Sequence, residues 1–207
     1  MFKYNKMDST TNKKIRLAII GTAGRSVDEK KLIGPIHFEF ATRSVLTYIM
    51  ENLGLDPFDV ILVSGGSAWM DHVAVNLYLS GGFGGLHLYL PSKFDPKQKK
   101  FVNTHEGRTL NELHTEFTNK MGSINSFDDL TKVASRGPKY NIRVEIKRGF
   151  LQRNTLIAQN CDHLLAFTFA PDSNSIAGGT KNTWDKTKHL NKTHFDLSLA
   201  HGQNIII

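Results

Sequence analysis

The sequence predicts an α/β fold, a Rossmann-like parallel sheet with helices on both faces and an insertion at about residues 92–140. Short apolar runs, which are typical of buried parallel strands, alternate along the chain with segments whose apolar residues recur at helical spacing. Strand and helix in alternation is the pattern of βαβ units, which place helices on both faces of one sheet.

Four apolar runs are the expected strands: residues 15–20, 60–63, 86–90 and 163–169. Three of these runs end in a glycine-rich turn or reach one after a short loop. Ligands of parallel sheets bind beyond the carboxyl ends of the strands. The glycine-rich strand ends therefore predict a ligand site.

Helical spacing predicts helices over residues 37–53, 69–79 and 151–160, and a last helix that follows the turn at 178–180 and runs to about residue 190. Residues 92–140 break the alternation, because they are basic and polar with only two expected helices, near 110–121 and 127–134. This stretch is too long for a simple connection, so we expect an insertion over one end of the sheet.

Length and composition indicate one globular domain. Residues 1–14 are polar without periodicity and are expected to form a flexible arm, which leaves residues 15–207 as a single Rossmann-like nucleotide-binding domain. No apolar run approaches the roughly 20 residues of a membrane span, and the N-terminus lacks the apolar stretch of a signal peptide. Cys161 is the single cysteine, so an intramolecular disulfide is excluded. We expect a cytoplasmic protein with no membrane partner.

The formal net charge of +7 permits attraction to phosphates, and so to nucleic acid through a basic surface. No zinc-ligand spacing or repeated basic–aromatic pattern indicates a dedicated nucleic-acid domain. No metal or other cofactor is expected. Glu112, His114 and Glu116 form no known metal-ligand spacing and are interpreted as an exposed helix face, and Cys161 is expected to be buried.

Four segments carry the candidate ligand-binding residues. Glycines after a strand let backbone N–H groups approach a ligand, helix N-termini favour anions, and arginine binds phosphate in a bidentate manner. Thr180 is expected to cap the last helix. The dinucleotide fingerprint G-x-G-x-x-G and the Walker sequence are both absent. The candidates are Gly21, Thr22, Gly24 and Arg25, then Ser64, Gly65, Gly66 and Ser67, then Arg153 and Asn154, and finally Gly178, Gly179 and Thr180.

The order of these segments resembles the Rossmannoid superfamily that joins the DNA-uptake protein DprA, the "lonely guy" cytokinin-activating phosphoribohydrolases and related SLOG nucleotide-binding domains. Gly66-Ser67-Ala68-Trp69-Met70-Asp71-His72 is similar to the G-x-A-x-G-[IA]-D segment of that group. Arg153-Asn154 through Ile157, followed by Cys161-Asp162, is similar to its R-N-x-x-[IL] helix and the aspartate after it. Gly178-Gly179-Thr180 is similar to its glycine–threonine phosphate loop.

The resemblance implies a homo-oligomer that binds a nucleotide or nucleoside phosphate and uses a carboxylate to hydrolyse its N-glycosidic bond. The phosphoribohydrolases carry P-G-G-x-G-T-x-x-E, whereas this chain lacks the proline and has Thr183 in place of the glutamate. The candidate catalytic carboxylates are therefore Asp71, Asp185 and Glu39, although Asp71 also suits the first turn of a helix for electrostatic reasons alone. Trp69, where the family often has an arginine, is expected either in the core or stacked on a purine.

Two alternatives to the hydrolase stay open. One is a non-catalytic sensor or sequestering protein for a nucleotide signal, which needs no glutamate. The other is single-stranded DNA binding of the DprA kind, which the net positive charge favours.

Overall fold

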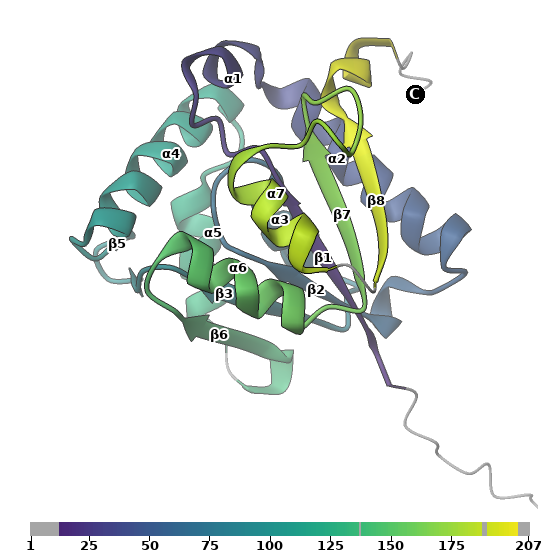
Figure 1. Cartoon of the computed structure of the whole chain (residues 1–207). Helices are drawn as coiled ribbons and strands as arrows, with labels where there is room; N and C mark the ends of the chain where they lie inside the picture. The colour runs from purple at the N-terminus through teal and green to yellow at the C-terminus, as the bar shows by residue number, and fades with distance from the viewer. Residues whose placement is uncertain (1–12, 137, 188–189, 203–207) are drawn as a thin grey trace, which may run out of the picture.

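A computed structural model describes residues 13–136, 138–187 and 190–202 of the chain. Most of the arm expected at residues 1–14 lies outside the described residues, as does the end of the chain from residue 203. Six parallel strands form one sheet in the order β6-β3-β2-β1-β7-β8 (Figure 1). Their bounds are β1 Ile15–Gly21, β2 Val60–Ser64, β3 Gly85–Leu90, β6 Ile142–Ile146, β7 His163–Thr168 and β8 Asn191–Asp196.

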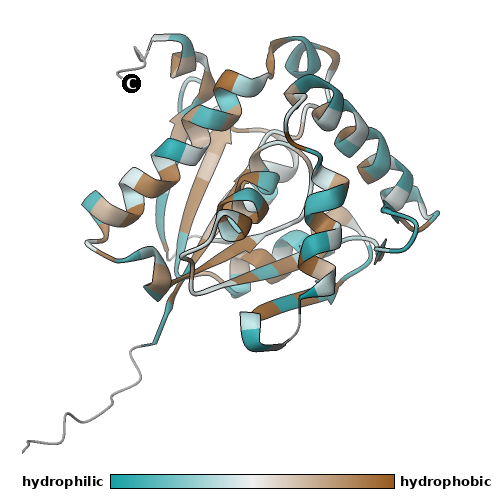
Figure 2. Ribbon diagram, turned by 180° about the vertical axis from the view of Figure 1, so that it is seen from behind, coloured by the Kyte–Doolittle hydropathy of each residue, from teal (hydrophilic) through white to brown (hydrophobic). Residues whose placement is uncertain are grey.

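Helices cover both faces of the sheet. They are α1 Val27–Leu32, α2 Pro35–Thr47, α3 Met70–Ser80, α4 His105–Met121, α5 Ser126–Ser135, α6 Phe150–Gln159 and α7 Gly178–Lys186. Alternate residues of β1 serve opposite faces: Leu17 and Ile19 belong to the larger core with α2 and α3, and Ala18 and Ile20 to the smaller core with α6. Figure 2 shows brown strands between helices that also carry teal residues. The predicted parallel α/β fold with helices on both faces is confirmed.

The four predicted strands are present, but the two edge strands were not predicted. β6 reads Ile-Arg-Val-Glu-Ile and β8 reads Asn-Lys-Thr-His-Phe-Asp, so neither is a continuous apolar run. Edge strands are only partly covered, which allows charged residues at alternate positions. The helix expected over residues 37–53 starts at Pro35 and changes at Tyr48–Asn52 into a π-helical turn.

The insertion belongs to the core. It comprises a two-stranded hairpin, β4 Phe94–Asp95 with β5 Lys100–Phe101, then α4, α5 and a 3₁₀ turn at Pro138–Tyr140. Leu110, Phe117 and Leu130 are buried in the larger core, and α5 packs against α3. The insertion thus adds to the core beside α3, and α4 also contacts the turn that follows β2 at the carboxyl end of the sheet.

The order of the strands determines where a crevice forms beyond the sheet. From β1 the chain moves outward through β2, β3 and β6, and then returns to the other side of β1 with β7. The connections that follow β1 and β7 leave toward opposite faces of the sheet, and a crevice forms beyond the strands at such a switch point. Among the described residues, no helix has the length and apolar character needed to cross a membrane.

Candidate functional site

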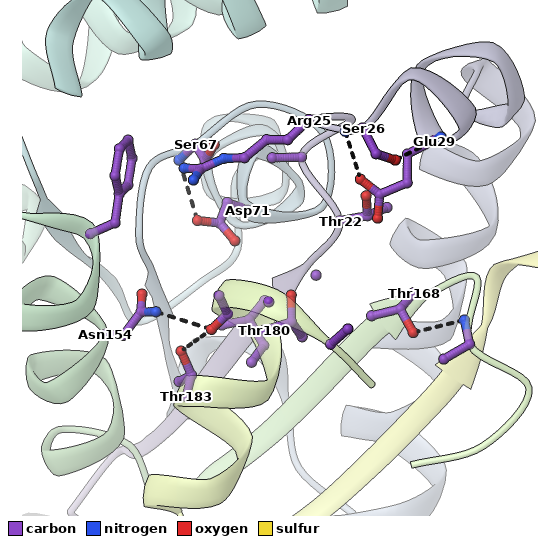
Figure 3. Close-up of a pocket in the computed structure, with 18 of the residues that line it drawn as sticks. Thr22, Arg25, Ser26, Glu29, Ser67, Asp71, Asn154, Thr168, Thr180 and Thr183 are labelled. Atoms are coloured by element: carbon purple, nitrogen blue, oxygen red, sulfur yellow. Dashed lines mark hydrogen bonds between the residues drawn. The ribbon is translucent and has the colours of Figure 1, made fainter. Parts of the chain in front are cut away.

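A cavity of about 470 Å³ lies at this switch point, beyond the carboxyl ends of β1 and β7. Its volume is within the range of small-molecule sites. The walls are the turn after β1, the first turns of α3, α6 and α7, and the loop after β7. Figure 3 shows Arg25, Ser67 and Asp71 on one side of this space, and Asn154, Thr180 and Thr183 on the other.

The turn after β1 approaches its neighbours so closely that only glycine fits at its start. A Cβ atom at Gly21 would overlap the carbonyl oxygen of Phe167 and the side chain of Met70. Next in the chain, the Thr22 N–H donates to the same Phe167 carbonyl at 2.9 Å, and the Thr22 hydroxyl accepts from the Gly24 N–H at 3.2 Å. The first wall of the cavity is thus fixed by backbone contacts between β1 and β7.

Arg25 brings a positive charge to the cavity. Its guanidinium lies over the ring of Phe150, 4.0 Å from the ring centre. Burial, and secondarily the charge of Arg153, lower the pKa of Arg25 below the usual arginine value. The nearby carboxylates of Asp71 and Glu29 act in the opposite direction and partly offset this lowering.

A buried ion pair forms the floor beside Arg25. The Nη1 atom of Arg153 lies 3.1 Å from the Oδ2 atom of Asp71, and each side chain is only 7% exposed. The same carboxylate oxygen accepts the Ser67 N–H at 3.3 Å. Gly65 leaves room for this pair, since a Cβ atom there would overlap the guanidinium. Within the described part of the chain, the Arg153 Nε and the Ser67 Oγ have no hydrogen-bond partner.

The first turn of α7 supplies backbone donors. The first hydrogen bond of the helix runs from the Lys181 N–H to the carbonyl of the N-cap residue, Ala177. The N–H groups of Gly178, Gly179 and Thr180 come before it and therefore have no acceptor within the helix. No side chain caps α7 among the described residues. Thr180 as the cap was therefore wrong, because the helix starts two residues earlier.

Asn154 and Thr183 hold this turn in place. The Asn154 amide donates to the Gly179 carbonyl at 3.0 Å, and the Thr183 hydroxyl donates to the same oxygen at 3.3 Å. Both side chains are buried. Asn154, predicted as a ligand-binding residue, thus also fixes the backbone of α7 relative to α6.

The structure brings most predicted residues to one cavity. Gly21, Thr22, Arg25, Ser67, Asp71, Arg153, Asn154, Gly178, Gly179 and Thr180 line it. Gly24, Ser64, Gly65 and Gly66 do not belong to the lining that the described residues form. Ser64 is instead fully buried behind the wall, where its hydroxyl donates to the Asp71 carbonyl at 2.7 Å.

Two of the three predicted catalytic carboxylates lie away from this cavity. Asp185 is exposed on α7 and pairs with Lys181 at 3.2 Å, one helical turn before it. Glu39 is exposed on α2. Neither is among the described residues that line the cavity. Of the three, only Asp71 is placed to act there.

Sequence reasoning missed a second carboxylate, Glu29, which lines the cavity from α1. Ser26 and Glu29 form a capping box: the Ser26 hydroxyl accepts the Glu29 N–H at 3.1 Å, and the Glu29 carboxylate accepts the Ser26 N–H at 3.5 Å. The S-x-x-E spacing is visible in the sequence and could have revealed this short helix.

The other missed lining residues lie mainly in loops and at the end of β7. They include Phe150, Thr168, Phe169, Ser175 and Thr183. Thr168 is bonded to His194 of β8, with 2.8 Å between the hydroxyl and Nε2, and burial lowers the pKa of that histidine. This contact could not be predicted from the sequence, because β8, which carries His194, was not predicted.

Behind the cavity, the insertion supports the turn after β2. Trp69 is 1% exposed, has a φ of 59°, and meets the Phe117 ring edge-on at 4.9 Å between ring centres. Its core alternative is confirmed. His114 is fully buried and its Nε2 lies 3.2 Å from the Gly66 carbonyl, so the exposed face predicted for it is wrong. Burial, with a contribution from His72, lowers the pKa of His114 to about 3.

The predicted burial of Cys161 is confirmed. In the described ranges, no group of three or more histidine, cysteine or acidic side chains is arranged to hold a metal ion. Cys161 is buried, and burial raises the pKa of its thiol to about 12.

Comparison with known proteins gives the chain a family. The chain is 41% identical over 186 residues to the uncharacterized protein R261 of Acanthamoeba polyphaga mimivirus. The aligned residues make up 90% of this chain and 98% of the viral protein. The chain belongs to the family of that protein. No protein-family model and no solved structure matches it.

Proposed function

We propose that this protein binds a nucleotide or nucleoside phosphate in the cavity, with the phosphate at the first turn of α7. The observation that carries the proposal is the uncapped N-terminus of α7, which lines the same cavity as Arg25 and Arg153. Helix N-termini attract anions through free N–H groups and the helix dipole, and arginine adds charge-assisted hydrogen bonds. The resemblance of these segments to SLOG domains supports the same class of ligand.

The rest of the cavity suits a nucleoside. Phe150 and Phe169 offer aromatic surface on which a base can pack, and hydroxyls of Thr22 and Thr168 are suited to a ribose. Asp71 is paired with Arg153, and the charges of Arg25 and Glu29 balance, so the charged side chains of the described lining sum to zero. The attraction for a phosphate therefore comes from its placement beside Arg25 and the N–H groups of α7. This combination favours a phosphorylated nucleoside over a free base or an uncharged nucleoside.

Hydrolysis of the N-glycosidic bond is the second candidate, and the presence of Glu29 in the cavity favours it. Such a reaction needs a carboxylate to stabilise an oxocarbenium-like sugar or to position water. Glu29 and Asp71 are the acidic side chains of the described cavity lining, and Asp71 is already paired. A sensor or sequestering protein would use the same phosphate contacts without either carboxylate.

Calorimetric titration with nucleoside monophosphates and diphosphates, each beside its unphosphorylated nucleoside, tests binding. We expect a phosphorylated member to bind at least roughly tenfold more tightly than its nucleoside, the effect of one charge-assisted hydrogen bond of about 1.5 kcal/mol. Arg25→Gln should weaken that binding by a similar factor. Lys181→Gln is the matched control, since it removes one positive charge from the exposed face of α7 and should leave affinity unchanged. Absence of binding by every nucleotide would refute the proposal.

Chromatography of free base after incubation separates the alternatives. Base release that is lost in Glu29→Gln but kept in Asp185→Asn indicates hydrolysis, whereas binding without base release indicates a sensor or sequestering protein. Tight binding of single-stranded DNA that falls steeply with salt and is unaffected by Arg25→Gln would instead favour DprA-like function outside the cavity.

A further inference from the structure

The two edges of the sheet differ in what they expose. β6 forms one edge and, within the described residues, pairs only with β3 (Figure 1). Val144 and Ile146 of β6 are 46% and 47% exposed, and Tyr140 just before them is 42% exposed. Across the sheet, the described residues of β8 include no exposed large apolar side chain. Unprotected apolar edge strands are rare in monomers because they pair readily with further strands.

Backbone hydrogen bonds fix which groups of β6 face outward. The Lys147 N–H donates to the Leu90 carbonyl at 2.9 Å, and the Asn141 carbonyl accepts from the Leu86 N–H at 3.1 Å. These odd-numbered residues therefore direct their backbone groups toward β3. Successive residues of a strand alternate, so the N–H and C=O groups of Ile142, Val144 and Ile146 point to the open edge.

The β6 sequence is complementary to itself when reversed. Around Val144 it carries a charged residue on each side, Arg143 and Glu145, and then an isoleucine on each side, Ile142 and Ile146. An antiparallel copy centred on Val144 would set each arginine opposite a glutamate and each isoleucine opposite an isoleucine. Centring on Arg143 or Glu145 would instead oppose two like charges, which destabilises a strand pair.

We propose that two copies of this chain pair through β6 about a two-fold axis that passes through Val144, and so form one sheet across the dimer. A two-fold interface requires a surface complementary to itself, and β6 meets this condition in both apolar character and charge. The outward-facing residues form the hydrogen-bonded pairs of the new antiparallel ladder, with Val144 opposite Val144 of the partner subunit.

Arg143 and Glu145 lie in the other class of cross-strand pair, where side chains are closer together. Within one chain the Arg143 Nη2 bonds the Glu145 Oε2 at 2.7 Å, and both side chains are partly exposed. In the dimer each can also meet its opposite in the partner. Exposed ion pairs add little affinity, so the ladder and apolar contacts hold the dimer while the charges select the register.

Sedimentation velocity of the full chain over a range of concentrations tests the dimer. The wild-type chain should dimerise. Arg143→Glu and Glu145→Arg should each weaken dimerisation by roughly tenfold or more, because each turns two attractive pairs into repulsive ones. An equimolar mixture of the two variants should form a heterodimer, and the double variant R143E/E145R should dimerise again. A monomeric wild-type chain, or a dimer that withstands both single reversals, would overturn the proposal.

Oxidative cross-linking tests the register. Val144→Cys should form a disulfide-linked dimer, since opposed residues of a hydrogen-bonded pair have Cα atoms about 5.5 Å apart, within the range of disulfides. Ile142→Cys and Ile146→Cys should not cross-link alone, because each faces the other position, but their mixture should. The native Cys161 is buried and should not compete. Cross-linking of Ile142→Cys alone as efficient as that of Val144→Cys would overturn the two-fold axis at Val144.

Discussion

Replacing His114 with glutamine should reduce the loss of stability that acidification causes. His114 lies on α4 and is fully buried, and its ring lies against those of His72, Phe101 and Phe127. With a folded-state pKa of about 3, it is neutral in the folded protein near neutral pH. The neutral ring with hydrogen on Nε2 can donate to the Gly66 carbonyl, and a glutamine amide can keep that donor without titrating.

The magnitude follows from the pKa difference between the folded and unfolded states. An unfolded histidine titrates at about 6.5. The folded pKa is depressed to about 3, so unfolding takes up a proton between these values and stability is lost as the pH falls. The contribution of His114 to the free energy of unfolding should therefore drop by about 2 kcal/mol between pH 7 and pH 5.

Urea unfolding at pH 7, 6 and 5 gives the free energy of unfolding at each pH. Plotted against pH, this free energy should fall less steeply toward low pH for His114→Gln than for the wild type. The comparison is needed because burial also lowers the pKa values of His37 and His87, which contribute in the same direction in both proteins. His105→Gln, an exposed change on the same helix, should leave the wild-type slope unaltered. Equal slopes for wild type and His114→Gln would refute the assignment of a neutral buried imidazole.

Three further changes test the packing around the cavity. Asp71→Ala should lower the free energy of unfolding by about 3–5 kcal/mol, because it leaves Arg153 buried without its partner. In a double-mutant cycle, adding Arg153→Met should recover part of this loss. Losses that simply add would contradict the pairing. Gly65→Ala should destabilise by about 1–3 kcal/mol through overlap with the guanidinium. Gly202→Ala, whose added Cβ would meet no atom of the described residues within 4 Å, should be near neutral in the same urea titration. Phe117→Ala should lower the free energy of unfolding by about 3–5 kcal/mol, because the ring is fully buried. A loss as small as that of a surface substitution, about 0.5 kcal/mol or less, would show that the insertion contributes little to the core.

Much of the fold was predictable because its central strands are buried on both faces. β1, β2, β3 and β7 appear in the sequence as apolar runs that end near glycines or at a turn, a pattern that local chemistry alone produces. β6 and β8 were missed because each is an edge strand of the described sheet, where charged residues are tolerated. The burial of His114 was missed for a related reason, since its helix packs its apolar face against α3 rather than toward solvent.

The site was predictable in part. Glycine-rich strand ends and an arginine near the start of a helix indicated which segments would meet, because parallel strands bring their carboxyl ends to one edge of the sheet. The same local reading placed Asp185 and Glu39 among the catalytic candidates, and both are exposed away from the cavity. Which side of a helix faces a cavity depends on how the helix is rotated against the sheet, and that rotation is set by packing.

The sequence by itself determined the parallel α/β fold and the turns that line the cavity after β1 and at the starts of α6 and α7, because strand burial, helix periodicity and glycine turns are local properties. Tertiary structure alone decided that Asp71 pairs with Arg153, that Glu29 joins the cavity and that β6 is an edge strand of the described sheet. Each of these depends on segments distant in the sequence meeting with a particular orientation. Such encounters follow from the packing of whole layers, which no single segment encodes.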